Sequence, residues 1–180
     1  MQDSGCQFDV ICLQETWVDQ SFDIGALNFD GYELISKPRT CSTHGGLAIL
    51  LKNGIQYRTL LHNINNFATW ERQIIEILDE EHMNTKLIIG NVYRLPRETN
   101  HDYDVFMEEL AHVLENFERS SNPLALFGDF NIDLLKISEK PKSNELFEFM
   151  VTKGLVPKIT FPTRFSRNSA TLIDNAFCKI

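Results

Sequence analysis

Residues 124–131, LALFGDFN, are an apolar run that passes directly into polar side chains. The first four residues are too few for a helix but are typical of a buried strand. Gly128 lets the backbone turn, so that Asp129 and Asn131 present a carboxylate and an amide on one short loop. The stretch therefore predicts a buried strand with reactive side chains at its C-terminal end.

Other predicted strands also end in polar side chains or are interrupted by them. These are Gln14 and Glu15 after Phe8–Leu13, Tyr93 and Arg94 at the end of Lys86–Tyr93, and Asp174 inside Thr171–Cys178. A single acid at a strand end is more often a turn or capping residue, and Asp174 alone could be a buried acid bonded to the backbone. Tyr93 alone could be a half-buried core residue. The set as a whole is harder to explain structurally.

Carboxylates, an amide and a phenol at strand ends suit metal-assisted phosphate chemistry. Mg²⁺ takes hard oxygen ligands, commonly one or two carboxylates together with waters and phosphate oxygens. The metal withdraws charge from the phosphoryl group, while a positioned acid or amide orients the attacking water. The sequence therefore predicts a site for this chemistry.

The rest of the chain alternates short apolar runs with turn signals, which predicts many strands. Further strands are expected over Tyr32–Ser36, Leu47–Leu51, Ile55–Leu61 and Trp70–Leu78. Asn53-Gly54 predicts a tight hairpin between the second and third of these strands. Residues 79–85 predict another hairpin, between Trp70–Leu78 and the strand that begins at Lys86.

Two segments have the apolar spacing of a helix. Helices are expected over Asp102–Arg119 and over Ser143–Thr152, the second capped by Ser143 and ended by Gly154. Many hairpin strands with a few helices between them indicate an α/β or α+β layered fold, in which sheets pack face to face with helices outside.

The composition is that of one ordinary globular domain, residues 1–180. Its 43% hydrophobic residues are too many for a disordered chain, and no apolar run reaches the roughly 18 residues of a membrane-spanning helix. The first residues lack the basic and apolar regions of a secretory signal, which favours an intracellular protein. The cysteines, which form no Cys-x-x-Cys pair, are expected to be free thiols: Cys6, Cys12, Cys41 and Cys178.

The charge is unevenly distributed along the chain. The 17 basic and 25 acidic side chains give a formal net charge of -8, which argues against non-specific coating of nucleic acid. Residues 136–180, however, carry eight basic and four acidic side chains, with Lys153, Lys158, Arg164 and Arg167 among the basic ones. This part could meet a phosphate-bearing partner or could be solvated surface.

Several segments resemble, in order, those of the endonuclease/exonuclease/phosphatase superfamily, and most closely the apurinic-type endonuclease domain of non-LTR retrotransposons. They are Asp9–Trp17 (DVICLQETW), Gly45–Leu50 (GGLAIL), Asn91–Pro96 (NVYRLP), Phe127–Asn131 (FGDFN) and Ala170–Phe177 (ATLIDNAF). The resemblance implies a four-layer α/β sandwich, with two packed, mainly antiparallel sheets flanked by helices. It also implies Mg²⁺- or Mn²⁺-dependent nicking of DNA by a nuclear protein fused to a reverse transcriptase.

The resemblance assigns roles to the residues at the strand ends. Glu15 matches the metal-binding glutamate, Asp129 the aspartate that aligns the attacking water, Asn131 and Tyr93 the residues that hold the scissile phosphate, and Asp174 the acid that orients a catalytic histidine. Arg94, which follows Tyr93, is expected to bind substrate. These matches predict a phosphodiesterase site built from the ends of several strands.

The sequence departs from the family pattern at both ends. A first strand that carries an asparagine and a final Ser-Asp-His segment are not seen, which predicts a fragment of a longer domain. The histidines, none of which has a matching context, are expected on the surface or in loops: His44, His62, His82, His101 and His112. Two alternatives therefore stay open: an inactive remnant of such a domain, and a phosphomonoesterase or lipid phosphodiesterase of the same superfamily.

Overall fold

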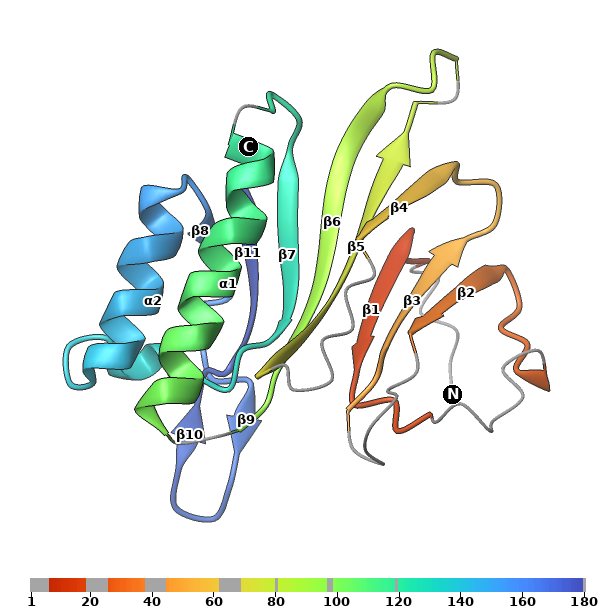
Figure 1. Ribbon diagram of the computed structural model, residues 1–180. Helices are drawn as coiled ribbons and strands as arrows, with labels where there is room; N and C mark the ends of the chain where they lie inside the picture. The colour runs from red at the N-terminus through yellow and green to blue at the C-terminus, as the bar shows by residue number, and fades with distance from the viewer. Residues whose placement is uncertain are drawn as a thin grey trace.

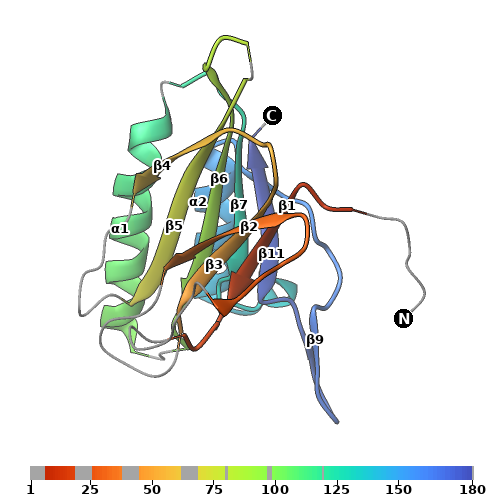
Figure 2. The same cartoon turned by 90° about the vertical axis from the view of Figure 1, so that its right-hand side faces the viewer.

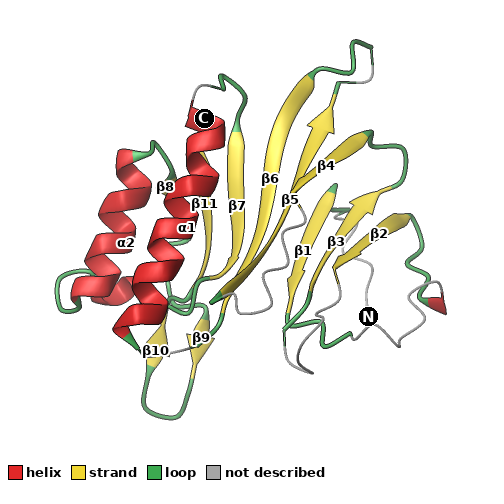
Figure 3. Ribbon diagram, viewed as in Figure 1, coloured by secondary structure: helices red, strands yellow, loops and turns green. Residues whose placement is uncertain are grey.

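The computed structural model describes residues 7–18, 26–37, 45–61, 69–79, 81–96, 99–118 and 120–179. In these ranges the chain forms two packed β-sheets, two α-helices and a small β-ribbon (Figures 1 and 3). Each apolar run expected to form a strand contains one, with boundaries that differ by a few residues at most.

The smaller sheet supplies one wall of the sandwich. Its strands are β1 (Val10–Gln14), β3 (Leu47–Lys52) and β2 (Tyr32–Lys37), in that spatial order and with antiparallel pairing. β3 is buried over most of its length, whereas β1 is half-buried throughout. β1 therefore lies at one edge of this sheet, and Glu15 directly follows its C-terminal end.

The larger sheet has six strands in the order β4-β5-β6-β7-β11-β8. They are β4 (Tyr57–Leu61), β5 (Trp70–Leu78), β6 (Thr85–Arg94), β7 (Leu124–Asp129), β11 (Asp174–Lys179) and β8 (Val156–Pro157). Neighbours pair antiparallel except β6 and β7, which are parallel. A parallel pair needs a crossover connection, and α1 (Asn100–Glu118) provides it.

The larger sheet packs against a different layer on each face (Figure 2). Because successive strand residues point to opposite faces, Ile74 joins Phe106 of α1 in the cluster under the helices, while Ile75 packs with Ile49 and Leu51 of the smaller sheet. α1 and α2 (Pro141–Thr152) both contribute to the first cluster. Neither helix is long and apolar enough to cross a membrane.

This arrangement confirms the predicted α/β sandwich with mainly antiparallel sheets. Both described helices cover the same face of the larger sheet, and the described residues place no α-helix over the outer face of the smaller one. A helical layer on that second face therefore stays a prediction.

The predicted start of α2 was wrong. The helix begins at Pro141, with Lys140 as its N-cap, and Ser143 lies inside the first turn, only 1% exposed. Proline fits the first helical position because a backbone N–H at that position would have no acceptor within the helix. The predicted end is confirmed, because Gly154 takes a φ of +76° and its N–H bonds to the carbonyl of Val151.

The predicted hairpin at Asn53-Gly54 was also wrong. Gly54 does take a positive φ, +93°, but β3 pairs with β1 and β2, whereas β4 pairs with β5. The turn therefore carries the chain from one sheet to the other. A turn dipeptide sets the local dihedral angles and not the partner of the strand that follows. The hairpin between β5 and β6 is confirmed.

Candidate functional site

Four polar side chains form a row across neighbouring strands of the larger sheet. Glu71 on β5 lies in register with Tyr93 on β6, Tyr93 with Asp129 on β7, and Asp129 with Asp174 on β11. Residues in register share one face, and this face is the one that packs on the smaller sheet, because Phe127, two residues before Asp129, lies in that interface. The sheet thus gathers three acids and a phenol that are far apart in the sequence.

Glu15 reaches this row from the opposite sheet. It follows β1 directly, and its carboxylate accepts a hydrogen bond from the Tyr93 hydroxyl. Its backbone is left-handed, with φ at +52°, which is uncommon for a residue other than glycine. Such a conformation persists only where the surroundings impose it, and it is concentrated at functional sites.

A buried amide fixes the end of β1 beside β6. The side-chain nitrogen of Asn91 donates to the carbonyls of Leu13 and Ala48, each at 3.0 Å, and its oxygen accepts from the Gln14 side chain at 2.5 Å. Asn91 is fully buried, so these bonds replace the water it would otherwise require. Asn91 begins the segment NVYRLP, but the sequence predicted no role for it.

The loop after β7 holds Asp129 and Asn131 in fixed positions. The Asn131 N–H donates to Asp129 Oδ1 at 2.8 Å, and the Asn131 side chain donates to the Arg94 carbonyl at 2.7 Å. Asn131, like Glu15, has a left-handed backbone, with φ at +49°. A Cβ on Gly128 would lie 1.9 Å from the Val92 carbonyl oxygen, so glycine permits the close approach of β6 and β7 here.

The acids of the site perturb one another. Burial, together with the negative charges of Asp174 and Glu15, raises the pKa of Asp129 from its ordinary 3.8 to about 7. The Asn131 N–H and the charge of Arg164 oppose this shift. Burial, followed by the bond to Glu15, also raises the pKa of Tyr93, so its hydroxyl stays protonated. Perturbed groups of this kind concentrate at functional sites.

Arg94, which was predicted to bind substrate, does not join the cluster. Neighbouring residues of a strand face opposite ways, so Tyr93 points toward the smaller sheet and Arg94 toward the helices. Arg94 as a whole is 4% exposed, and its guanidinium lies over the rings of Tyr103 and Phe106 and donates to the Asn131 carbonyl at 3.4 Å. Arg94 therefore supports the loop that carries Asn131 from the side of the sheet that faces the helices.

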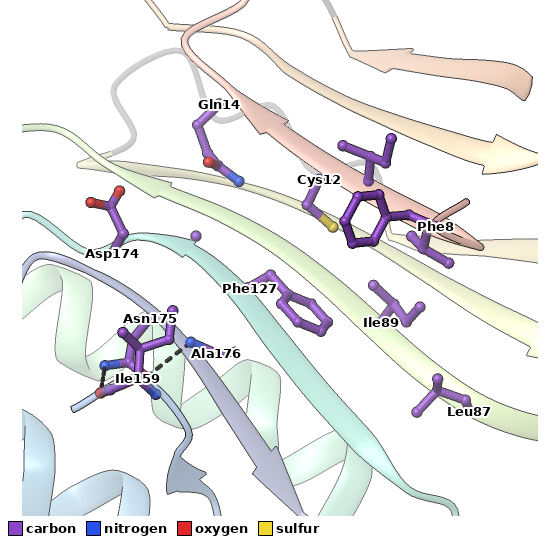
Figure 4. A pocket seen from close by; sticks show the side chains of 13 residues that line it. Phe8, Cys12, Gln14, Leu87, Ile89, Phe127, Ile159, Asp174, Asn175 and Ala176 are labelled. Atoms are coloured by element: carbon purple, nitrogen blue, oxygen red, sulfur yellow. Dashed lines mark hydrogen bonds between the residues drawn. The ribbon is translucent and has the colours of Figure 1, made fainter. Parts of the chain in front are cut away.

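A groove of about 530 Å³ opens between β1 and the larger sheet, next to this row (Figure 4). Gln14 and Asp174 lie at one end of the groove, whereas Phe8 and Leu87 lie toward the other, where the walls are apolar. Asp174, the last member of the polar row, therefore borders this groove.

The exposed ribbon beside the site carries cations and aromatic rings. β9 (Arg164–Phe165) and β10 (Ala170–Thr171) pair with each other and project from the lower end of the larger sheet (Figure 1). Phe161 and Phe165 are 67% and 73% exposed, and Arg167 is exposed at the tip. Arg164 lies close enough to influence Asp129.

The donor set of the site fits a hard cation better than zinc. Its groups are carboxylate, phenol and amide oxygens, which suit Mg²⁺ or Mn²⁺. Burial raises the pKa of Cys12 to about 12, so this thiol stays protonated, and the described histidines are exposed on α1 or the β5–β6 turn. In the described part of the chain, no three His, Cys, Asp or Glu side chains converge as a complete metal site. A Mg²⁺ site can consist of only one or two carboxylates together with several waters.

The chain belongs to the endonuclease/exonuclease/phosphatase family, whose sequence profile matches residues 3–179. This is a family of phosphoesterases, which agrees with the acidic site at the strand ends. No curated protein sequence matches the chain.

Solved structures share the fold. The endonuclease domain of TRAS1, a telomere-specific non-LTR retrotransposon, has a TM-score of 0.65 at 16% identity, covering 95% of this chain and 72% of that one. The human Nocturnin catalytic domain gives 0.65 at 16% identity, with 95% and 69% covered. The 3′ phosphatase NExo from Neisseria, bound to a product DNA hairpin, gives 0.65 at 20% identity, with 95% and 76% covered.

Proposed function

We propose that the chain is a DNA-nicking endonuclease of the non-LTR retrotransposon type, which hydrolyses one phosphodiester bond with the help of Mg²⁺ or Mn²⁺. The observation that carries this proposal is the row of Tyr93, Asp129 and Asp174 with Glu15 facing it from the other sheet. Family membership supports the reaction class, and the retrotransposon endonuclease and the DNA-bound phosphatase among the relatives support DNA as substrate. Action in the nucleus and fusion to a reverse transcriptase belong to the same proposal.

Glu15 is the residue proposed to hold the metal. When bound, the ion would withdraw charge from the phosphate and so favour attack by water. The bond from Tyr93 fixes the carboxylate of Glu15, and the left-handed backbone turns it out of the smaller sheet toward the row. The protein thereby presents one oriented carboxylate ligand. This suits a metal site in which water and substrate fill most of the coordination positions.

Asp129 is proposed to align the attacking water. Its Oδ1 is held by the Asn131 N–H, and its raised pKa suits a group that accepts a proton near neutral pH. Asp174 lies directly beside it in the sheet. With two acids in adjacent positions, the charge of one favours proton uptake by the other.

Tyr93 and Asn131 are proposed to hold the scissile phosphate. A protonated phenol and an amide are both neutral hydrogen-bond donors, so each can donate a hydrogen bond to an anionic phosphate. The Asn131 amide is fixed by its bond to the Arg94 carbonyl and keeps a second N–H for the phosphate, whereas the Tyr93 hydroxyl, whose one proton goes to Glu15 in the free chain, would turn from Glu15 to donate to the phosphate.

The ribbon is proposed to contact DNA beyond the reacting bond. It carries Arg164, Phe165 and Arg167, with the exposed Phe161 three residues before it, in the part of the chain where basic residues are in excess. Arginine binds backbone phosphate, and exposed aromatic rings stack on bases. Of the two sequence-based interpretations of that segment, this proposal adopts contact with a phosphate-bearing partner.

A second candidate is a phosphomonoesterase with the same site. The relatives that favour it are the phosphatases, including a mannosyl-6-phosphatase from Bacteroides thetaiotaomicron with a TM-score of 0.63 at 15% identity, covering 96% of this chain and 71% of that one. Both chemistries would use Glu15, Asp129 and Asn131 in the same way, so substrates must separate them.

The test compares three substrates at equal protein concentration, with Mg²⁺ and with chelator. They are supercoiled plasmid, bis-(p-nitrophenyl) phosphate and p-nitrophenyl phosphate. We expect metal-dependent conversion of plasmid to the open circle and little release from the monoester. Faster turnover of the monoester would replace the endonuclease by a phosphomonoesterase, and no turnover of any substrate by the folded chain would favour an inactive remnant.

A further inference from the structure

Glu71 lies at the end of the polar row, and its side chain crosses from the larger sheet to the smaller one. The carboxylate oxygen Oε2 accepts a hydrogen bond from the Gly46 N–H at 2.7 Å. Gly46 immediately precedes β3, so the bond joins the start of β5 to the start of the central strand of the other sheet. No sequence pattern had indicated a role for Glu71.

Gly46, which Glu71 holds, and its neighbour Gly45 are also the partners of the segment after Glu15. The Thr16 N–H donates to the Gly46 carbonyl at 3.2 Å, and the Trp17 N–H donates to the Gly45 carbonyl at 2.9 Å. Trp17, like Glu15, has a left-handed backbone, with φ at +54°. The unusual path of residues 15–17 is therefore fixed by bonds to Gly45 and Gly46.

The contact between these two segments has little room for adjustment. Gly46 has a φ of +90°, and a Cβ built on it would lie 2.6 Å from Thr16 Oγ1. A displacement of Gly46 would therefore be passed on to Thr16 and to Glu15 beside it. Glu15 in turn accepts a hydrogen bond from Tyr93, which is the register neighbour of Glu71. The contacts therefore lead from Glu71 through Gly46 and Glu15 back to the strand next to Glu71.

We propose that Glu71 is a positioning residue, which holds Gly45 and Gly46 and thereby sets the direction in which Glu15 presents its carboxylate. Its importance for activity rests on the proposed function, in which Glu15 anchors the metal. Glu71 itself does not touch the substrate. Its carboxylate acts as an acceptor at a defined place, so glutamine can replace it in part and alanine cannot.

The first test uses amide hydrogen exchange, measured by NMR in metal-free buffer. In Glu71→Ala, the Thr16 and Trp17 amides should exchange at least about tenfold faster, because a hydrogen bond to a charged group is lost. Glu71→Gln should retain most of the protection. Glu76→Ala is the matched control, since Glu76 lies on the same strand and pairs with Arg58 instead; it should leave both amides unchanged relative to the Asn91 amide in β6.

A shorter acid covers the case in which Glu71→Ala does not fold. Glu71→Asp keeps the charge but withdraws the acceptor from Gly46, and it should also speed exchange at Thr16 and Trp17. Wild-type protection of these amides in Glu71→Ala, or in Glu71→Asp where the alanine variant is unfolded, would overturn the proposal.

The second test measures Mn²⁺ binding by electron paramagnetic resonance. Glu71→Ala should weaken binding about as much as Glu15→Gln does, whereas Glu71→Gln should weaken it less. Unaltered Mn²⁺ affinity in Glu71→Ala would overturn the link to Glu15. Failure of the wild-type chain to bind Mn²⁺ would contradict the proposed function instead, while the exchange rates would still decide whether Glu71 positions residues 15–17.

Discussion

The hydroxyl of Tyr93 donates a hydrogen bond to the carboxylate of Glu15, across the boundary between the two sheets and over 78 residues of sequence. Tyr93 is 4% exposed, so its hydroxyl depends on this partner. The bond places the carboxylate of an edge strand opposite the acids of the larger sheet. Neither side chain would define a site without the other.

Tyr93→Phe should therefore reduce both stability and activity. The loss of a buried bond to a charged acceptor should lower the free energy of unfolding by about 1.5–3 kcal/mol. Loss of one donor to the phosphate should reduce nicking by about 10²-fold. The checks are urea denaturation and plasmid nicking.

Tyr57→Phe is the matched control for this variant. The Tyr57 hydroxyl also joins the sheets, since it donates to Glu33 at 2.7 Å, but it lies away from the polar row and is exposed to solvent. Its removal should change nicking less than about twofold and stability by less than about 1 kcal/mol. If the two variants lost nicking activity to the same extent, the Tyr93 hydrogen bond would serve stability alone.

Ionisation of Asp129 should make the free chain less stable as the pH rises. The folded chain keeps the proton up to about pH 7, whereas the unfolded chain loses it near the ordinary value of 3.8. Since the folded state binds more protons between these values, the free energy of unfolding should fall through that window, at up to about 1.4 kcal/mol per pH unit. This contribution is fully present below about pH 4 and is lost above about pH 7.

Asp129→Asn removes this titration while keeping the acceptor for the Asn131 N–H. Urea denaturation in chelator should show that the variant gains stability over wild type as the pH rises from about 4 to 7. The same variant should lose nicking by at least about 10²-fold. Parallel pH curves for the two proteins would show that the Asp129 pKa is not raised.

Gly128→Ala should be among the most destabilising single substitutions in the chain. The new Cβ would lie 1.9 Å from a backbone oxygen, so β6 and β7 would have to move apart. A loss of more than about 3 kcal/mol is expected by thermal or urea denaturation. Gly54→Ala, with a positive φ but no atom within 4 Å of the added Cβ, should cost only about 1 kcal/mol. Similar losses in both would refute the close-approach argument.

The ribbon should act mainly on DNA binding, and loss of the Arg164 charge should in addition raise the pKa of Asp129. Arg164→Ala and Arg167→Ala should each weaken binding and reduce the salt slope of log K by about 1, because each arginine neutralises one phosphate. Fluorescence anisotropy over a range of salt concentrations checks this. Arg58→Ala removes an arginine of β4 that pairs with Glu76 of β5, and it should leave the slope unchanged. An unchanged slope in the ribbon variants would show that the ribbon does not contact DNA.

Much of the fold could be predicted because the apolar runs are short and well separated. Trp70–Leu78 has the predicted ends, and α1 differs by two residues at its start. The pairing of the strands was harder to predict from the sequence. Asn53-Gly54 forms a turn, as its residues require, but the partners of β3 and β4 depend on side-chain packing between sheets that no local pattern encodes.

The site was predictable where a polar residue interrupts or ends an apolar strand. Tyr93, Asp129 and Asp174 could be picked out in this way, and the register that joins them could not. Because neighbouring residues of a strand face opposite sides of a sheet, the sequence alone could have predicted that Tyr93 and Arg94 lie on opposite faces. Glu71 gave no local signal, because a polar residue near the start of a strand is ordinary and its partner Gly46 lies in another sheet.

Plasmid nicking by wild type and Glu15→Gln tests the central claim most directly, with Mg²⁺ titrated in both. Glutamine keeps the size of the side chain but removes its charge, and Glu33→Gln controls for loss of a carboxylate elsewhere on the smaller sheet. We predict Mg²⁺-dependent nicking by wild type and Glu33→Gln, with a loss of at least about 10²-fold in Glu15→Gln, since the ion contributes several kcal/mol of charge stabilisation. Equal nicking by Glu15→Gln, or none by the folded wild-type chain, would contradict the account.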